Sequence, residues 1–179
     1  ILSAYLIGNI SPAIILGKIN GIDIKKEGSG NAGTTNALRV LGKKAAVITL
    51  VVDILKGVVA VKFGMMLGYE TGIWCALAVF CGHIWPCLYR FKGGKGVATA
   101  FGAILSVNWL LALTALAIVA CGLLISKRMS VGSLLGAATF PVACWFMEKD
   151  FIIVGCIMAA IVLIKHRANI VRLFKGEGP

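Results

Sequence analysis

The chain has 179 residues, of which 59% are hydrophobic and 14% are charged, and its net charge is +11. Soluble domains usually carry about 25% charged residues, so this composition argues against a water-soluble enzyme and predicts an integral membrane protein with one helical domain over residues 1–179. The basic residues lie at the ends of apolar segments and lack the interleaved aromatic residues that stack on bases. This pattern favours anionic lipid headgroups or an anionic substrate over nucleic acid.

The apolar segments follow one another at residues 1–19, 45–67, 72–89, 97–126, 129–147 and 151–164. No basic region precedes the first segment, which predicts a retained span rather than a signal peptide. The fourth segment has 30 residues and would form a helix of about 45 Å, too long for one upright span. Asn108 lies near its middle, where a turn would divide it into two short helices.

The distribution of basic residues decides between one long helix and a hairpin. A hairpin near residues 97–126 places most of the 18 lysines and arginines on one membrane face, whereas a single crossing moves the basic C-terminus to the other face. The positive-inside rule therefore favours the hairpin and predicts seven transmembrane helices, with the N-terminus outside and the C-terminus in the cytoplasm. Residues 151–164 are short for a span, so we expect Lys165 to snorkel and the helix to run on.

Three polar, cationic runs interrupt the apolar segments, and the predicted topology places all three on the cytoplasmic face. The first polar run, residues 28–39, contains the sequence GSGNAGTTN followed by Arg39. The second, residues 91–96, reads FKGGKG, and the third, residues 166–172, reads HRANIVR. Because hydropathy alone brings the three runs to one face, we expect them to form a shared site.

The first polar run matches the pattern GxGxxG but lacks the βαβ unit of a dinucleotide-binding motif. The remaining alternatives are a flexible loop and an ordered oxyanion-binding turn before a helix. The second alternative is favoured because the run is rich in glycine N–H groups and in polar donors. The side-chain donors are those of Ser29, Asn31, Thr34, Thr35, Asn36 and Arg39.

The second run is not a Walker A loop, because Gly96 follows Lys95 where a serine or threonine is needed. A plain positive-inside anchor would need its lysines but not its three glycines, so we expect the glycine N–H groups to point at an anion. In the third run His166, Asn169 and Arg172 recur at helical spacing and share one broad face of a continuing helix. The alternative for the third run is a solvated basic tail.

Ionisable residues also occur within the apolar segments. His83, in the sequence GHIWP, lies near the cytoplasmic end of the third segment and is either a packing residue or a functional one. Asp53 and Lys56 are three residues apart and are expected to form a structural pair inside the bundle rather than a catalytic one. The six cysteines contain no CxxC pair and the carboxylates are scattered, so we predict neither a metal nor another cofactor.

Taken together, these motifs resemble the three signature motifs of the bacterial acyl-phosphate:glycerol-3-phosphate acyltransferases (PlsY type). The resemblance rests on GSGNAGTTN with Arg39, on GHIWP running on to FKGGKG, and on HRANIVR. Ser11-Pro12, the sequence DILKG at residues 53–57 and the closing Lys175-Gly176-Glu177 are also similar. The match covers nearly the whole chain in order, and Thr34 is a departure because the family more often has alanine there.

The resemblance implies a seven-span enzyme of the bacterial inner membrane with its active site on the cytoplasmic face. Such an enzyme would move a fatty acyl group from acyl phosphate to the first hydroxyl of glycerol 3-phosphate. The products would be lysophosphatidic acid and phosphate, and neither acyl-CoA nor acyl carrier protein would serve as donor. Its partners would be the two substrates and membrane lipid, without nucleic acid, and a monomer is favoured.

We assign roles to individual residues on this basis. The acyl phosphate is expected to be held by Lys92, Gly93, Gly94, Lys95 and Gly96. Glycerol 3-phosphate is expected to contact Ser29, Asn31, Thr35, Asn36, Arg39, His166, Asn169 and Arg172. The candidates for catalysis are His83, His166, Asn169 and Lys95. The His–Asp dyad of other acyltransferases is absent, so the general base is one of the two histidines or the acceptor's own phosphate.

A small transporter or channel for phosphate or a phosphorylated metabolite is the main alternative, because it shares the helical bundle and the anion-binding helix ends. Such proteins usually show internal repeats and a site near the membrane midplane. The chain shows no repeat, and its three runs lie at one predicted face. A scaffold protein would not explain three anion-binding loops.

Overall fold

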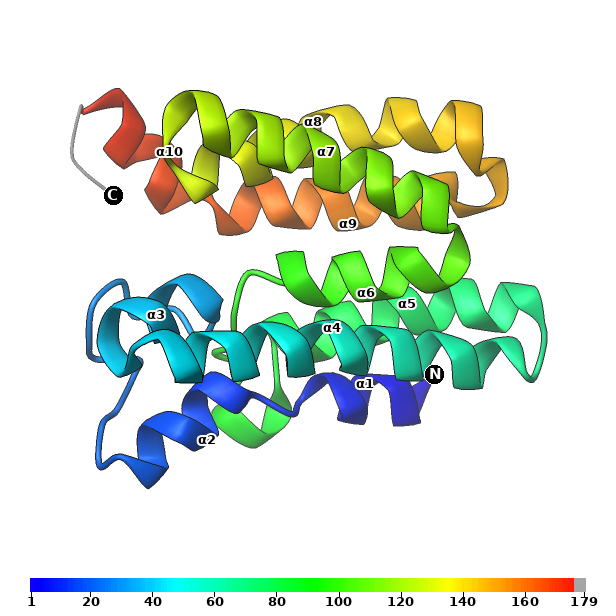
Figure 1. Cartoon of the computed structure of the whole chain (residues 1–179). Coiled ribbons are helices and arrows are strands. Elements are labelled where there is room, and N and C mark those ends of the chain that lie inside the picture. Colours follow the sequence, from blue (N-terminus) through cyan, green and yellow to red (C-terminus); the bar gives the residue numbers. More distant parts are fainter. Residues whose placement is uncertain (176–179) are drawn as a thin grey trace. The chain divides into compact units, whose positions relative to one another are not determined.

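The computed structural model describes residues 1–175, and all regular secondary structure in this range is helical (Figure 1). The predicted all-α class is therefore confirmed, whereas Gly176 and Glu177 of the closing motif lie outside the described residues. The α-helices are α1 (Leu2–Gly8), α2 (Pro12–Ile19), α3 (Thr34–Leu41), α4 (Lys43–Met65), α5 (Tyr69–Ile84), α6 (Val97–Val107), α7 (Trp109–Ser126), α8 (Met129–Met147), α9 (Ile152–Lys165) and α10 (Arg167–Phe174). Two short 3-10 helices, η1 (Cys87–Tyr89) and η2 (Lys149–Phe151), lie between α5 and α6 and between α8 and α9.

The chain divides into two compact units, one formed by residues 1–107 and the other by residues 108–179. In the first unit α4 packs against α3, α5 and α6, and α1 packs against α5. In the second unit α8 packs against both α7 and α9, and α10 contacts α9. That the whole chain forms one domain stays a prediction.

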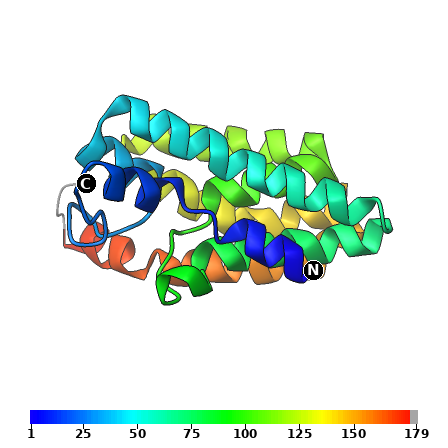
Figure 2. The same cartoon turned by 90° about the horizontal axis from the view of Figure 1, so that it is seen from below.

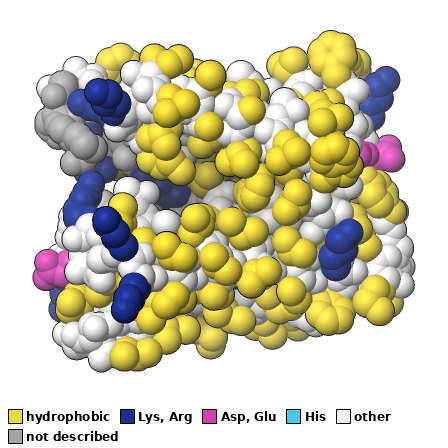
Figure 3. Space-filling model, in the orientation of Figure 1, with side chains coloured by type: hydrophobic (Ala, Val, Ile, Leu, Met, Phe, Trp, Pro, Cys, Tyr) yellow, Lys and Arg dark blue, Asp and Glu magenta, His cyan; other side chains and the backbone are white. Residues whose placement is uncertain are grey.

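Three helical segments are long and apolar enough to cross a membrane, namely Tyr69–Tyr89, Trp109–Ser126 and Met129–Met147. The number rises to five if each of two bent pairs, α1 with α2 and η2–α9 with α10, counts as one span. The space-filling view shows many hydrophobic side chains on the surface of each unit, as lipid contact requires (Figure 3). Seven spans and their orientation stay predictions.

Helix α4 carries several charges yet presents an apolar stripe to its surroundings. Val47, Val51, Leu55, Val59 and Phe63 recur every four residues and are all exposed, from 40% for Val59 to 62% for Phe63. Residues four apart lie on one side of a helix, so the stripe is a single continuous face. The charged Asp53 and Lys56 are instead buried against the rest of the first unit. This arrangement suits a helix with lipid on one side and a polar interior on the other.

The first predicted segment, residues 1–19, is not one continuous helix. Helix α1 ends at Gly8 and α2 starts at Pro12, and the two are bent by 40°. The break between them lies in the blue part of the chain in Figure 2. The proline ring disfavours a helical conformation at the preceding residue, and Ser11 is accordingly extended, with φ −118° and ψ 93°. The bend frees backbone carbonyl groups that other residues must satisfy.

The fourth predicted segment breaks at the residue that the sequence indicated. Helix α6 ends at Val107, and Asn108 caps the N-terminus of α7 by accepting hydrogen bonds from the N–H groups of Leu110 (3.0 Å) and Leu111 (3.1 Å). Its amide nitrogen donates to the Met147 carbonyl (3.2 Å) and to Glu148 Oε2 (3.0 Å). The break at Asn108 is therefore confirmed, and the hairpin stays a prediction.

The expectation of a continuous last helix was wrong. Helix α9 ends at Lys165 and α10 begins at Arg167, and the two are bent by 51°. His166 occupies the junction with φ −94° and ψ 6°. Its carbonyl still accepts from Asn169 N (2.8 Å) and Ile170 N (2.9 Å), so the junction starts the new helix. Asn169 and Arg172 consequently belong to α10, and His166 precedes it.

Candidate functional site

The first polar run forms a turn that is braced by a side chain from α3. Gly28 and Gly30 have left-handed φ values of 57° and 68°, which glycine adopts without steric strain. Asn36 Oδ1 accepts from Ser29 N (2.8 Å), and Asn36 Nδ2 donates to the carbonyls of Ile24 (3.1 Å) and Glu27 (3.1 Å). The turn is therefore held in place by hydrogen bonds rather than being a flexible loop. Both N–H groups of the Asn36 amide are used within it, which favours a role in shaping the turn over substrate contact.

Several predicted ligand-binding residues of the first run remain accessible around this turn. Ser29, Thr35 and Arg39 are exposed, and Asn31 is half-buried. The Arg39 side chain lies along the turn, since a Cβ atom built on Gly28 would be 3.3 Å from Arg39 Cδ. Helix α3 starts at Thr34, and the first N–H groups of a helix have no partner within it. Guanidinium, hydroxyl and helix N–H groups together suit a phosphate oxygen.

The glycines of the second run have a structural cause that differs from the expected one. Gly93 N donates to the Ile84 carbonyl (3.1 Å) and Gly94 N to the His83 carbonyl (3.2 Å), so both cap the C-terminus of α5. These two N–H groups are thereby used, and they do not point at an anion as the sequence suggested. Gly93 packs so closely that a Cβ atom would collide with the His83 carbonyl. What remains in this run to attract an anion is the positive charge of its two lysines, Lys92 and Lys95.

The structure brings the first and second polar runs together. A Cβ atom on Gly94 would lie 3.0 Å from the carbonyl oxygen of Ala32 in the first run, and it would collide with His83 Nε2. A second link is the hydrogen bond from Lys25 Nζ to the Tyr89 carbonyl (3.2 Å), which joins the segment before the first run to the segment before the second. Two runs that are far apart in the sequence thus meet beside His83.

Asp53, Lys56 and His83 form a buried polar network beneath this junction. Lys56 Nζ lies 2.7 Å from Asp53 Oδ1, which confirms the predicted pair. The same ammonium group donates to the Ile10 carbonyl (2.7 Å) and contacts His83 Nδ1 at 2.7 Å. All three side chains are at most 5% exposed. Lys56 thus satisfies a carbonyl at the α1–α2 break and also holds the His83 ring.

Asn9 is a structural residue that the sequence reasoning missed. It is fully buried at the α1–α2 break, and its Oδ1 accepts from Leu88 N (3.2 Å) and Cys87 Sγ (3.1 Å). Its Nδ2 donates to the Tyr5 carbonyl (2.8 Å). An amide side chain inside an apolar segment must find such partners. The position of Asn9 in the sequence was therefore enough to predict a structural role for it. Asn9 ties the first segment to the chain that leads into the second polar run.

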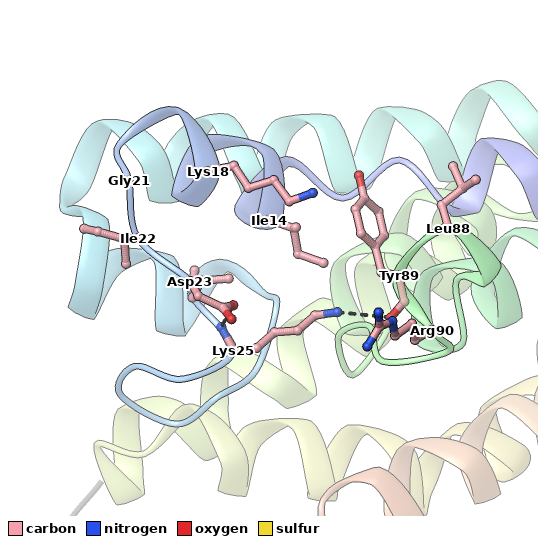
Figure 4. Close-up of a pocket in the computed structure, with 10 residues that line it drawn as sticks. Ile14, Lys18, Gly21, Ile22, Asp23, Lys25, Leu88, Tyr89 and Arg90 are labelled. Atoms are coloured by element: carbon pink, nitrogen blue, oxygen red, sulfur yellow. Dashed lines mark hydrogen bonds between the residues drawn. The ribbon is translucent and has the colours of Figure 1, made fainter.

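A pocket of about 580 Å³ lies beside the two runs in the first unit (Figure 4). Its lining includes Lys18, Lys25 and Arg90, together with Asp23 and the ring of Tyr89. The ammonium groups of Lys18 and Lys25 lie 5.7 and 5.4 Å from the centre of that ring. Partial burial lowers the pKa of Lys25, against the opposing effect of Asp23 and with the help of Lys92 and Lys18. The residues predicted to bind substrate do not line this pocket, so we assign it to neither substrate.

The third polar run belongs to the second unit, and its convergence with the other two stays a prediction. The His166 side chain is buried, with Nδ1 2.8 Å from the Val162 carbonyl one turn earlier. Asn169 and Arg172 are half-buried on α10. Since a carbonyl oxygen can only accept, His166 Nδ1 carries a proton.

Apolar helices, an interior charged network and two joined glycine-rich, basic loops define a helical membrane protein with a site suited to anions. The chain matches the family model described as glycerol-3-phosphate acyltransferase over residues 1–176. A glycerol-3-phosphate acyltransferase of Thermoanaerobacter pseudethanolicus is 46% identical over 177 residues, which cover 97% of this chain and 89% of that protein. One of Clostridioides difficile is 44% identical over 182 residues, with 97% and 89% of the two chains covered.

The fold is also similar to that of a solved structure. The crystal structure of PlsY, an integral membrane glycerol 3-phosphate acyltransferase, in its glycerol 3-phosphate form superposes with a TM-score of 0.93 at 31% identity and covers 99% of this chain and 91% of that one. The lysophosphatidic acid form of PlsY gives a TM-score of 0.89. The chain belongs to the glycerol-3-phosphate acyltransferase family of the PlsY type.

Proposed function

We propose that this chain transfers a fatty acyl group from acyl phosphate to the sn-1 hydroxyl of glycerol 3-phosphate, at the cytoplasmic face of the bacterial inner membrane. The observation that carries the proposal is the meeting of the first two polar runs at Gly94 and Ala32. Two phosphorylated compounds need two adjacent anion-binding regions, and these runs offer them. The PlsY structures in glycerol 3-phosphate and lysophosphatidic acid forms support the same acceptor and product.

The proposed reaction needs no covalent enzyme intermediate. The acceptor hydroxyl oxygen attacks the carbonyl carbon of the acyl phosphate, a new ester C–O bond forms, and the C–O bond to the phosphate breaks. Inorganic phosphate leaves, and the hydroxyl proton passes to a base. Because the donor is a mixed anhydride with a stable leaving group, the protein chiefly has to orient the two substrates and stabilise developing negative charge.

The residues divide between the two substrates as follows. Lys92 and Lys95 provide the positive charge for the acyl phosphate, and the run from Gly93 to Gly96 shapes its place against α5. Ser29, Asn31, Thr35 and Arg39 bind glycerol 3-phosphate from the first unit. For His166, Asn169 and Arg172 we propose contacts to the same substrate. Asn36 fixes the turn that presents Ser29, and no metal or other cofactor is required.

The test is a product assay with purified protein. We expect acyl phosphate and glycerol 3-phosphate to give equal amounts of lysophosphatidic acid and phosphate, and acyl-CoA to give no product. Phosphate uptake into proteoliposomes without product would favour the transport alternative and refute the proposal. Efficient use of acyl-CoA would refute the proposed donor.

Two lysine variants test the acyl phosphate site within the same assay. Lys95→Ala should raise the KM for acyl phosphate by about tenfold or more, because one charge-assisted contact to a phosphate is lost. Lys62→Ala is the matched control: it removes an exposed lysine from the last turn of α4, and the KM should stay unchanged. Unchanged KM values in both variants would contradict the assignment of Lys95.

A further inference from the structure

His83 faces the Lys56 ammonium group through Nδ1, and this contact fixes the protonation of the imidazole ring. The distance from Lys56 Nζ to His83 Nδ1 is 2.7 Å, and both side chains are buried. Burial opposes the charge of this ammonium group, and Asp53 Oδ1 at 2.7 Å supplies the opposite charge that favours it. An ammonium group has three donors and no acceptor, so His83 Nδ1 accepts. A neutral ring that accepts at Nδ1 carries its proton on Nε2.

A second possible partner of Nδ1 does not compete with Lys56. Asp53 Oδ1 lies 3.3 Å from His83 Nδ1, farther than Lys56 Nζ at 2.7 Å, and this oxygen is itself paired with Lys56 Nζ at 2.7 Å. An Nδ1–H group would also point its proton at the ammonium group. A doubly protonated ring would place two cations within 2.7 Å of each other in a buried site, which costs far more than the neutral arrangement.

The proton on Nε2 points to the place where the two polar runs meet. A Cβ atom on Gly94 would collide with His83 Nε2, lie 2.9 Å from Cε1 and lie 3.0 Å from the Ala32 carbonyl. His83 thus brings a donor from the interior of the first unit to the boundary between its two loops. Helix α5 fixes the position of the ring, and Lys56 and Asp53 fix its tautomer.

We propose that His83 is a neutral Nε2–H donor for a phosphoryl oxygen of the acyl phosphate and that Lys56 and Asp53 are its positioning residues. The proposal rests on the proposed function for the identity of this ligand. His83 transfers no proton in this role. Its donor stabilises the negative charge that collects on the departing phosphate as the acyl C–O bond breaks. His83 is thereby removed from the candidates for general base, which leaves His166 and the acceptor's phosphate.

The chain contains only two histidines, which makes the tautomer directly measurable. Long-range 1H–15N spectra of the full-length, histidine-labelled protein without substrate should show His83 protonated on Nε2 and His166 protonated on Nδ1. The His166→Ala variant removes one set of signals and so assigns both. His83 protonated on Nδ1, or on both nitrogens, at neutral pH would overturn the proposal. This result does not depend on activity, so it is separable from a failure of the proposed function.

The same spectra test the role of Lys56. In Lys56→Met the donor to Nδ1 is absent, and Asp53 Oδ1 at 3.3 Å becomes the nearest charged partner. The His83 proton should therefore move to Nδ1 in a substantial fraction of molecules. An unchanged Nε2–H signal in this variant would show that Lys56 does not set the tautomer.

A pair of variants separates donation from proton abstraction. His83→Gln keeps an N–H donor but cannot take up a proton, whereas His83→Leu keeps neither ability. We expect His83→Leu to lose about 100-fold to 1,000-fold in kcat, as when one oxyanion donor is removed, and His83→Gln to stay within about tenfold of the wild type. Equal inactivity of two variants with matched thermal stability would refute the donor role.

Discussion

Close packing at single glycines determines how near the two polar runs approach each other. Gly94 leaves room for the His83 ring on one side and the Ala32 carbonyl on the other, while its own N–H caps α5. The sequence indicated that these glycines matter, but it suggested an anion-binding backbone as the reason. The direction of a backbone N–H depends on the partner that the fold supplies, and here that partner is a helix C-terminus.

Gly94→Ala tests this packing. The added methyl group should displace either His83 or the first run, destabilise the protein by about 1–3 kcal/mol and reduce kcat/KM by about 100-fold, since a displacement near 1 Å is enough for such a loss. Activity and thermal unfolding in detergent measure the two effects. Gly21→Ala is the control: Gly21 has φ 69° and no atoms within 4 Å of the added methyl, so it should cost about 1–2 kcal/mol of backbone strain and leave activity intact. Wild-type activity in Gly94→Ala would contradict the close approach.

The residue pairing in the interior was predictable only within one helix. Asp53 and Lys56 are three residues apart, a spacing that places both on one face of α4, and the expected pair is present. His83 joins them from α5, and no local spacing relates positions 27 residues apart. The participation of Ile10 was equally hidden, because its carbonyl becomes available only where α1 and α2 separate.

At the scale of helices, a break was easier to predict where the sequence has a residue that caps or interrupts helices than where it has none. The break at Asn108 followed from segment length and from a residue type that caps helices well. The bend at His166 has no nearby proline or glycine between residues 156 and 175 to mark it, so helical periodicity suggested a continuous helix. The break at residues 9–11 carried the marker Pro12, but the apolar character of the segment concealed it.

Variants of Asn108 test the cap of α7. Asn108→Ala should lower the free energy of unfolding by about 0.5–2 kcal/mol, because the N–H groups of Leu110 and Leu111 lose their acceptor. Asn108→Ser keeps an acceptor and should be milder. Asn108→Asp also keeps one but places a carboxylate against Glu148, so its stability should improve as the pH falls and one acid is protonated. Thermal unfolding at two pH values measures this order, and equal stability of all three variants would rule out the cap.

At the scale of the whole molecule, charge asymmetry links the fold to the proposed function. The three polar runs carry basic residues, and in the predicted seven-span topology the positive-inside rule would place them on the cytoplasmic face. The apolar stripe on α4 and the apolar helices α7 and α8 supply the lipid-facing surface that such a topology needs. If the proposed function holds, a site at this interface would give the acyl chain a direct route from the bilayer and would give glycerol 3-phosphate access from water.

The most direct test of this site is cysteine cross-linking between its first and third polar runs. In a chain whose six cysteines are replaced, Thr35→Cys and Arg172→Cys should be joined by a short bifunctional maleimide in native membranes, and glycerol 3-phosphate should slow the reaction. Thr35→Cys paired with Glu70→Cys, which is predicted on the opposite face, should not be joined. We expect the cysteines introduced by Thr35→Cys and Arg172→Cys to resist impermeant reagents added outside the cell. Labelling of either one from outside, or the absence of a cross-link between these two positions, would contradict a shared cytoplasmic site.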